Sequence, residues 1–497
     1  MTDYIPSKSE FLRLAKKGNL IPVYKEISAD LETPVSAFLK IDKSDYSFLF
    51  ESVEGGEKIA RYSFLGSAPS LIFRSKAREI EIIENGKRTL FTTSSDPLFE
   101  IKKILGRYKF ARTPGLPRFC GGLVGFMAYD MVNFFEELPS LGSDDLGLAD
   151  AVFLLTDTIL IFDHINHSIK VVSNAYIDKD PNEAYEIAKK KIDGLIELLN
   201  LPLIRERKPV FPGRESKKKV DFTSNLTKDE FCDIVKKAKG YINNGDIIQV
   251  VLSQRLETEV NCSETDLYRA LRMVNPSPYM YLLKLNNMSL IGASPELMVR
   301  CEDGMVELRP IAGTRPRGKT EEMEKRLEKN LLTSAKERAE HIMLVDLGRN
   351  DIGRVCEYGS VRVSELMTVE KYSHVMHIVS ECAGKLRKGK DQFDVIRATF
   401  PAGTVSGAPK VRAMEIIEEL EKTKRGPYAG LVGYFSFSGN LDTCINIRTI
   451  LMRGKKVYIQ AGAGIVADSN PEKEYEETMN KARGTVKAIE LAEEGGI

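Results

Sequence analysis

The sequence predicts a large α/β protein of the mixed (α+β) type, built in two lobes. The chain has 497 residues, which is enough for about two or three ordinary domains or for one large two-lobed unit. Its first half alternates short β-rich runs with turns, whereas its second half mixes amphipathic helices with strands. Residues 201–225 carry prolines and a basic run without an apolar period, which is typical of a linker between two lobes.

Residues 1–200 form the predicted N-terminal β-rich lobe. Segments such as SFLFES, SLIFRS and EIEIIENGKRTLF are rich in β-branched and aromatic residues and are separated by turn residues. The Asn-Gly of ENGK predicts a tight hairpin, because both central positions of that turn need a positive φ. Residues 181–201 predict an amphipathic helix at the end of this lobe.

Residues 226–497 form the second predicted lobe. In the last helix Asn470 is the expected N-cap and Pro471 takes the first helical position. The stretch CGGLVGFMAYD at 120–130 echoes YAGLVGYFSFSG at 428–439, which is compatible with two halves built on similar sheets. The predicted elements of this lobe are a strand over residues 247–260 and helices over residues 227–246, 263–275, 321–347 and 470–494.

Composition excludes several classes of protein. With 72 basic and 71 acidic residues, the charge gives no sign of a nucleic acid or an anionic membrane as partner. No apolar run approaches the roughly 20 residues that a membrane-spanning helix needs, and the N-terminus lacks the apolar core of a signal peptide. The seven cysteines are scattered and form no C-x-x-C pair. They are expected to be reduced thiols, which indicates a cytoplasmic protein.

Two predicted helices each carry a pair of acids three residues apart, which places both acids of a pair on one helix face. The pairs are Glu337 with Glu340 and Glu474 with Glu477. For either pair alone a solvated helix face is the simpler interpretation. If the two pairs converge, four carboxylates need a cation, and ligands that are all oxygen favour Mg²⁺.

On a helical wheel, the two pairs lie on different sides relative to the apolar residues of their helices. Glu340 shares its side with apolar residues of its own helix and should point inward. Glu474 and Glu477 lie opposite the apolar stripe of the last helix, which consists of Tyr475, Met479, Ala482 and Val486. Zinc is disfavoured, because His374 and His377 would lie on opposite faces of a strand.

Three glycine-containing loops are compared with known phosphate and nucleotide motifs. FPAGTVSGAPK, from Phe400, lacks the Gly-Lys-Ser/Thr order of a phosphate loop. QAGAGIVADSNP, from Gln460, contains Gly462 and Gly464 but is not followed at once by a helix, which argues against a dinucleotide. LRPIAGTRPRG, from Leu308, resembles no phosphate loop. Each of the three is compatible with an ordinary tight turn.

Taken together, the motifs are far more specific. They occur in the order GDIIQVVLSQR, IGASPEL, RPIAGTRPRG, AEHIMLVDLGRND, VMHIVS, FPAGTVSGAPK, GPYAGLVGY, NIRT, QAGAGIVADSNP and EYEETMNKA. This set resembles the chorismate-binding enzymes, most closely the component I group of the anthranilate synthases, densely over residues 226–490. The resemblance implies a four-layered sandwich of largely antiparallel sheets with helices outside. It also implies conversion of chorismate and ammonia to anthranilate and pyruvate, the first step of tryptophan biosynthesis.

The resemblance also assigns roles to single residues. Glu340 and Glu477 are similar to the direct Mg²⁺ ligands, and Glu337 and Glu474 to the acids that hold the water shell of the ion. Glu296 matches the general acid for the departing C4 hydroxyl, a task that requires a raised pKa. His377 matches the residue associated with pyruvate elimination. The positions that match residues lining the site or binding substrate are Thr404, Tyr428, Arg448, Gly462, Gly464 and Lys481.

Two positions separate related activities within the family. Gln249 stands where isochorismate and salicylate synthases have a lysine base, and a glutamine cannot activate water. Ala312, in PIAGT, stands where aminodeoxychorismate synthase has a nucleophilic lysine. Both fit amination by ammonia. Because Cys120 lacks the setting of an amidotransferase nucleophile, a separate glutamine amidotransferase subunit is implied as partner. An aminodeoxychorismate synthase with an atypical loop and a non-catalytic ligand sensor remain as alternatives.

A regulatory site is implied as well. Glu51 and Ser52, together with the NPSPYM segment at residues 275–280, resemble the two walls of the family's tryptophan feedback site. The residues expected in contact with tryptophan are Glu51, Ser52, Pro278, Tyr279 and Met280. Without the resemblance, the same segments read as a β-turn and a helix stop. Binding there should couple reciprocally to chorismate.

Overall fold

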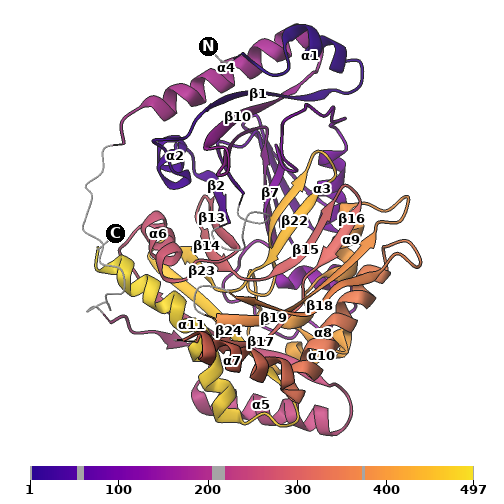
Figure 1. The fold of residues 1–497 in the computed structure, drawn as a ribbon, viewed down its shortest axis with the longest axis vertical. Coiled ribbons are helices and arrows are strands. Elements are labelled where there is room, and N and C mark those ends of the chain that lie inside the picture. Colours follow the sequence, from indigo (N-terminus) through magenta and orange to yellow (C-terminus); the bar gives the residue numbers. More distant parts are fainter. Residues whose placement is uncertain (1–2, 53–60, 204–218, 319, 372–374, 496–497) are drawn as a thin grey trace.

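The computed structural model describes residues 3–52, 61–203, 219–318, 320–371 and 375–495. Two large sheets, each of 12 strands, make up the centre of the molecule (Figure 1). Every paired strand within them runs antiparallel to its neighbours. The prediction of antiparallel-rich sheets in an α/β protein is therefore confirmed.

The first sheet, called sheet A, has strands from both ends of the chain. In spatial order its strands are β1 (Leu20–Ser28), β10 (Ser168–Tyr176), β9 (Thr158–Asp163), β3 (Tyr62–Ser67), β2 (Tyr46–Glu51), β13 (Tyr279–Leu285), β14 (Ser289–Ser294), β23 (Thr449–Arg453), β24 (Lys456–Ile465), β12 (Gln249–Glu259) and β11 (Thr223–Ser224), with β20 (Gly407–Ala408) paired to β12.

The second sheet, called sheet B, is assembled in the same way. Its strands are β17 (Ile311–Pro316), β19 (Val375–Lys385), β16 (Met305–Leu308), β15 (Leu297–Glu302), β22 (Leu441–Ile445), β21 (Leu431–Ser436), β7 (Gly122–Met127), β8 (Ala151–Thr156), β4 (Leu71–Lys76), β5 (Glu79–Glu84) and β6 (Lys87–Thr92), with β18 (Arg362–Lys371) paired to β19.

Side chains alternate between two cores along each strand, as the period of a strand requires. On β13, Leu283 belongs to the core between the two sheets, whereas Leu282 packs outward against helices. On β8, Leu154 faces the core between the sheets and Phe153 faces the helices on the other side. Helices thus cover both outer faces of the paired sheets, and the predicted four layers are present.

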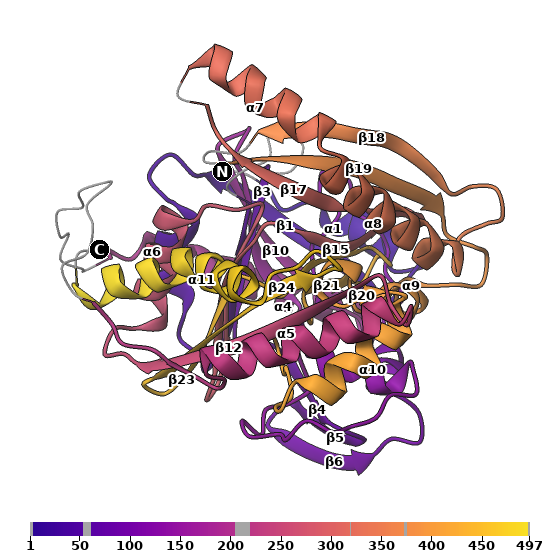
Figure 2. The same ribbon diagram turned by 90° about the horizontal axis from the view of Figure 1, so that it is seen from below.

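The helices lie outside the sheets (Figures 1 and 2). No described helix is long and apolar enough to cross a membrane. The helices are α1 (Lys8–Leu14), α2 (Pro34–Ile41), α3 (Pro97–Leu105), α4 (Pro181–Asn200), α5 (Lys228–Asn243), α6 (Glu264–Val274), α7 (Glu321–Thr333), α8 (Ala335–Gly353), α9 (Gln392–Thr399), α10 (Lys410–Leu420) and α11 (Pro471–Glu493), with short 3₁₀ turns η1 (Tyr129–Phe134) and η2 (Gly403–Val405).

Most predicted local elements are confirmed. Asn85 and Gly86 both have positive φ in the turn between β5 and β6, and Asn470 caps α11 by accepting a hydrogen bond from the Lys473 N–H. The single helix predicted over residues 321–347 is wrong. Ser334 interrupts it with a ψ of 114°, and its side chain accepts from the Glu337 N–H, so that α8 begins as a separate helix.

The two echoed segments are neighbours in sheet B. They form β7 and β21, which pair so that Gly125 lies opposite Gly433. In sheet A the corresponding junction joins β2 to β13. Hydrogen bonding therefore continues across the proposed division into lobes 1–200 and 226–497, and that division remains a prediction. Residues 204–218 of the predicted linker lie outside the described residues.

Candidate functional site

The two acidic pairs lie near enough to one another for Glu337, Glu474 and Glu477 to act electrostatically on Glu340. Glu337 and Glu340 occupy the first two turns of α8, and Glu474 and Glu477 those of α11. Burial raises the pKa of Glu340, and repulsion from the other three carboxylates raises it further, against the effect of Lys336. Glu474 is buried, although the wheel placed it opposite the apolar stripe, while Met479 of that stripe is exposed. The helical-wheel prediction for Glu474 is therefore wrong, because its carboxylate is hydrogen-bonded with Ser469 in the loop before α11.

Three of these four acids form an ion pair with a cation of the protein. Arg315 lies 2.9 Å from Glu337, Lys481 lies 2.7 Å from Glu477, and the Lys336 ammonium is 3.9 Å from Glu340. Among the described residues, no three His, Cys, Asp or Glu side chains lie together closely enough to hold a metal ion. The donor set nevertheless fits Mg²⁺ in kind, because it consists of carboxylate oxygens whose mutual repulsion a hard cation would relieve.

Glu296 lies between β14 and β15 and borders a cavity of about 390 Å³ of space, part of it open to solvent. Its side chain is half-buried by area because it borders this cavity, but its carboxyl lies deep in the protein. Burial raises the pKa of Glu296 to about 8 despite the nearby Thr404 hydroxyl and Lys481 ammonium. The Thr404 hydroxyl is itself buried, with no partner of ordinary hydrogen-bond length among the described residues. Glu296 is therefore a carboxylic acid that keeps its proton near neutral pH.

His377 lies on β19 beside β17. Its Nδ1 is 3.0 Å from the carbonyl oxygen of Gly313 and 3.1 Å from the Thr314 hydroxyl. Burial lowers the pKa of His377, and the charge of Arg448 lowers it further, against the effect of the Gly313 carbonyl. A proton on Nδ1, inferred from the carbonyl contact, leaves Nε2 as the basic nitrogen.

Lys481 connects the predicted site residues. Its ammonium donates to the Gly462 carbonyl oxygen at 2.9 Å and forms the ion pair with Glu477. Its own carbonyl oxygen accepts a hydrogen bond from the Arg448 guanidinium. Tyr428 approaches the same strand, because its hydroxyl oxygen would lie 2.7 Å from a Cβ placed on Gly462. The charge of Lys481 also acts on Glu296, so that residues from five separate segments form one cluster.

Gln249 and Gly464 lie on the neighbouring strands β12 and β24. A Cβ on Gly464 would stand 2.4 Å from Gln249 Nε2, so the missing side chain leaves the space that the amide occupies. Ala312 lies on β17 opposite Ile378 of β19. His374, the second histidine of the rejected zinc pair, lies outside the described residues.

A second cavity lies between the two sheets and holds about 550 Å³ of space, part of it open to solvent. All five residues predicted to contact tryptophan line it, and Met280 pairs directly with Glu51 across β13 and β2. Burial raises the pKa of Glu51, although Arg272 and the Tyr268 hydroxyl both bond to its carboxylate. The Ser52 hydroxyl is buried without a hydrogen-bond partner among the described residues.

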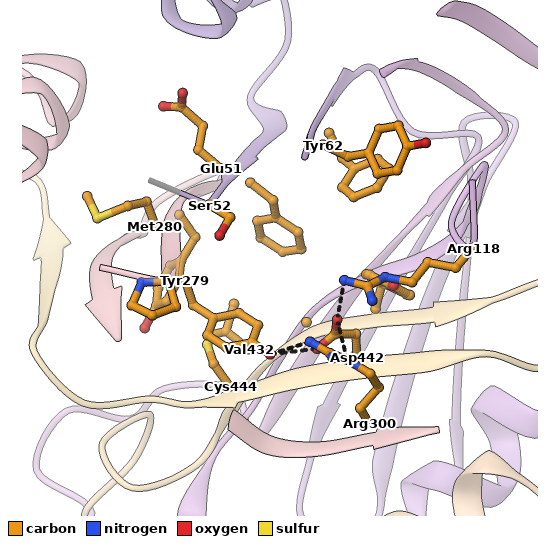
Figure 3. Close-up of a pocket in the computed structure, with 16 residues that line it drawn as sticks. Glu51, Ser52, Tyr62, Arg118, Tyr279, Met280, Arg300, Val432, Asp442 and Cys444 are labelled. Carbon is orange, nitrogen blue, oxygen red and sulfur yellow. Dashed lines mark hydrogen bonds and ion pairs between the residues drawn. The ribbon is translucent and has the colours of Figure 1, made fainter. Parts of the chain in front are cut away.

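The floor of this cavity is a charged network that sequence reasoning missed (Figure 3). Asp442 of β22 is paired with Arg300 and Arg118, both at 3.1 Å, and it accepts a hydrogen bond of 3.0 Å from the Tyr279 hydroxyl. Because Tyr279 belongs to sheet A and Asp442 to sheet B, the network joins the sheets. The sequence offers one signal of this network: Asp442 and Arg300 are charged residues within largely apolar strands, and buried charges need partners.

The fold and the cluster around Lys481 define a class of α/β protein in which a buried carboxylic acid and two cations lie together between antiparallel sheets and helices. A family model described as chorismate binding enzyme matches residues 45–487, and the chain belongs to this family.

Two relatives named anthranilate synthase component 1 match almost the whole chain. The protein of Acetivibrio thermocellus is 50% identical over 99% of both chains, and that of Aquifex aeolicus is 52% identical over 98% of both.

Solved structures agree with this. The anthranilate synthase component I of Streptococcus pneumoniae matches with a TM-score of 0.76 at 36% identity, covering 93% of this chain and 99% of its own. MenF, the menaquinone-specific isochorismate synthase of Escherichia coli, matches with a TM-score of 0.69 at 18% identity, covering 97% of this chain and 98% of its own, and shows only a shared fold.

Proposed function

We propose that this chain is the chorismate-converting component of an anthranilate synthase, which forms anthranilate and pyruvate from chorismate and ammonia. The observation that carries the proposal is the cluster around Lys481, which brings a protonated carboxylic acid and two cations to one place. His377 lies near enough to one of these cations, Arg448, for that charge to lower its pKa. A binding module would need no proton donor at this position, which argues against the non-catalytic alternative.

The substrate has two carboxylates, and the site offers two cations for them. Arg448 presents a planar guanidinium that suits a carboxylate, and Lys481 lies one helical turn from Glu477. Mg²⁺, when bound, would supply Lewis-acid stabilisation of the ring carboxylate, with Glu340 and Glu477 as its ligands and Glu337 and Glu474 around them. The present pairing of these acids with Lys336, Lys481 and Arg315 would then have to rearrange.

The protein side chains divide the remaining work. Glu296 donates its proton to the oxygen that leaves C4, which a buried acid with a pKa of about 8 can do at neutral pH. Thr404, beside it, orients this carboxyl or the substrate. His377, through Nε2, takes part in the elimination of pyruvate and the restoration of the aromatic ring. Gln249 has no basic group to activate water, which favours ammonia as the nucleophile.

The sister activity, aminodeoxychorismate synthesis, is disfavoured at one position. Its nucleophilic lysine would have to stand at Ala312, where β17 offers only a methyl group. We propose further that ammonia comes from a glutamine amidotransferase subunit, because the buried Cys120 has a pKa raised by burial to about 12 and is no nucleophile. All seven cysteines are free, which supports the proposed cytoplasmic location.

We also propose that the cavity between the sheets binds tryptophan as a feedback inhibitor. Its walls carry aromatic rings, and its size falls within the range of small-ligand sites. The buried Ser52 hydroxyl supplies a further polar group without a protein partner among the described residues.

One assay tests the activity. The purified chain is mixed with Mg²⁺, chorismate and ammonium at mildly alkaline pH, and the fluorescence of anthranilate is recorded. Anthranilate with release of pyruvate supports the proposal. A non-aromatic amino product would instead assign the sister activity, and unchanged chorismate would reduce the chain to a binding protein.

A further inference from the structure

His341 follows the proposed metal ligand Glu340 on α8 and faces into the protein. Its side chain is completely buried. His341, Val345 and Gly348 follow one another at spacings of four and three residues, so they form one stripe of α8 that packs on the sheet. On β19 the Cys382 sulfur lies 3.8 Å from the Val345 carbonyl oxygen and would lie 3.9 Å from a Cβ placed on Gly348. His341 is thus a polar residue in an otherwise apolar or small contact surface.

The partner of His341 is Ser380 of β19, which is also completely buried. The His341 Nε2 lies 2.6 Å from the Ser380 hydroxyl oxygen. The same oxygen accepts a hydrogen bond of 2.9 Å from the backbone N–H of Met367 on β18. One hydroxyl group therefore connects a helix and two strands.

The local structure of β18 is adapted to this contact. Glu365 pairs with Glu381 and Thr368 pairs with Val379, so two residues of β18, Leu366 and Met367, stand opposite Ser380. Met367 has a φ of 54°, an uncommon value for a residue that is not glycine. This bulge turns the Met367 N–H toward the hydroxyl of Ser380, which normal pairing would not do.

The bulge also reaches α7. The Met367 side chain packs on a small core that contains Leu331 of α7 and Met376 and Ile378 of β19. Figure 2 shows α7, α8, β18 and β19 together in this part of the molecule. The Ser380 hydroxyl therefore bonds to α8 through His341 and to β18 through Met367, whose side chain in turn packs near α7.

We propose that His341 and Ser380 form a positioning pair that fixes the rotation and the height of α8 on β19, and thereby holds Glu337 and Glu340 opposite the acids of α11. The metal ion in this inference depends on the proposed function, whereas the position of α8 on β19 does not. Apolar packing is non-directional, and the small Gly348 and Cys382 would let α8 slide or turn on the sheet. A buried hydrogen bond has a direction and a length, and it selects one arrangement.

The first test compares two truncations beneath the same helix. Ser380→Ala removes the hydroxyl, and Cys382→Ala, two residues along the same face of β19, removes a thiol that gives α8 a longer and weaker hydrogen bond, 3.8 Å from Sγ to the Val345 carbonyl oxygen. Mn²⁺ binding is measured by electron paramagnetic resonance with chorismate present and ammonium absent, so that no turnover occurs. We expect Ser380→Ala to weaken Mn²⁺ binding by about tenfold, the factor that corresponds to one buried hydrogen bond, and Cys382→Ala to bind like the wild type.

A second pair of variants tests the histidine. His341→Gln keeps an amide that can donate to or accept from Ser380, whereas His341→Leu keeps the volume and loses the hydrogen bond. The glutamine variant should retain more of the Mn²⁺ affinity, although both variants alter the core. Equal losses in the two, wild-type affinity in Ser380→Ala, or an equal loss in Cys382→Ala would overturn the proposal.

Hydrogen exchange separates this inference from the function on which it rests. In the metal-free chain, the α8 amides should exchange faster in Ser380→Ala than in Cys382→Ala. Equal protection would refute the positioning pair. If the wild-type chain bound no Mn²⁺ at all, the metal assignment would fail, while faster exchange in Ser380→Ala would still support the pair.

Discussion

Glu296 combines two demands that usually conflict, because a proton donor must hold its proton at neutral pH and still release it. Its position beside a cavity but deep in the protein meets the first demand by desolvation. Lys481 and Thr404 limit the shift, since both favour the charged form. A sequence can indicate such a residue by its motif, but the burial that sets the pKa depends on segments far apart along the chain.

The raised pKa predicts how stability depends on pH. Between the ordinary value of 4.5 and the folded value of about 8, the unfolded chain releases a proton that the folded chain retains. The folded state therefore loses relative stability as pH rises through this window. Glu296→Gln should abolish turnover and lack this loss, so its melting temperature should exceed that of the wild type more at pH 9 than at pH 5. Glu197→Gln, at an exposed site on α4, is the control, and parallel pH profiles for Glu296→Gln and wild type would contradict the assignment.

A second prediction concerns Gly464, where a substitution by alanine would add a single methyl group. An alanine there would place Cβ 2.4 Å from Gln249 Nε2, and its three nearest neighbours are all atoms of that flexible side chain. Gly464→Ala should fold normally but displace the amide, lowering kcat/KM by about ten- to a hundredfold. Gly240→Ala is the control, since its Cβ would meet no atom within 4 Å on helix α5. It should raise stability by about 0.5–1 kcal/mol without changing turnover. Unaltered kcat/KM in Gly464→Ala would remove Gln249 from the mechanism.

At the scale of elements, the site depends on where α8 and α11 begin. In the sequence, Asn470 and Pro471 predict the start of α11, and the structure confirms this start. The start of α8 was missed, although Ser334 with Glu337 three residues later is a recognisable capping pattern. Residues that favour helices lie on both sides of Ser334, so the sequence pattern predicts one continuous helix and not a new start at α8. The break places Glu337 in a first helical turn, where the helix dipole favours a carboxylate.

The convergence of α8 and α11 predicts a particular response to metal. Without a divalent cation, burial and the three neighbouring carboxylates oppose ionisation of Glu340, so Glu340→Gln should raise the melting temperature at pH 7. With Mg²⁺ and chorismate, the wild type should be stabilised and the variant should not, and turnover of the variant should be lost. Glu476→Gln, at an exposed position between Glu474 and Glu477, serves as the control. Wild-type activity in Glu340→Gln would refute its role as a ligand.

At the scale of the molecule, the sequence predicts the kind of architecture better than its connections. The period-2 runs and the Asn-Gly turn predict antiparallel strands, and the structure contains them. Strand order could not be derived, because β2 pairs with β13 and β7 pairs with β21 across sequence separations of more than two hundred residues. The echo between β7 and β21 was the one local hint of this pairing. The two segments resemble each other partly because each has a glycine, Gly125 in β7 and Gly433 in β21, at a place where a Cβ would clash with the backbone of the adjoining strand.

The continuity of the sheets gives a route by which the proposed tryptophan site can influence the catalytic site. The Tyr279 hydroxyl of sheet A bonds to Asp442 of sheet B. Asp442 lies on β22, where the N–H of Ile445 donates to the carbonyl oxygen of Glu296 at 3.1 Å. A ligand that displaces Tyr279 therefore acts, through one short strand, on the backbone of the proposed proton donor. By linkage, chorismate must oppose tryptophan to the same extent.

Tyr279→Phe tests this route, because it keeps the ring in the wall of the cavity and removes only the hydroxyl. Asp442 remains paired with Arg118 and Arg300, so the cost in stability should be limited to about 0.5–1.5 kcal/mol. Tryptophan should still bind, but the ratio of its Kd with and without saturating chorismate should move toward one. Isothermal titration measures this ratio in wild type, in Tyr279→Phe and in Tyr281→Phe. Tyr281 lines the same cavity, but its hydroxyl contacts Asn446 and Thr449 and not Asp442. If Tyr279→Phe kept the wild-type ratio while Tyr281→Phe lost it, the coupling would have to run through β23 instead of β22.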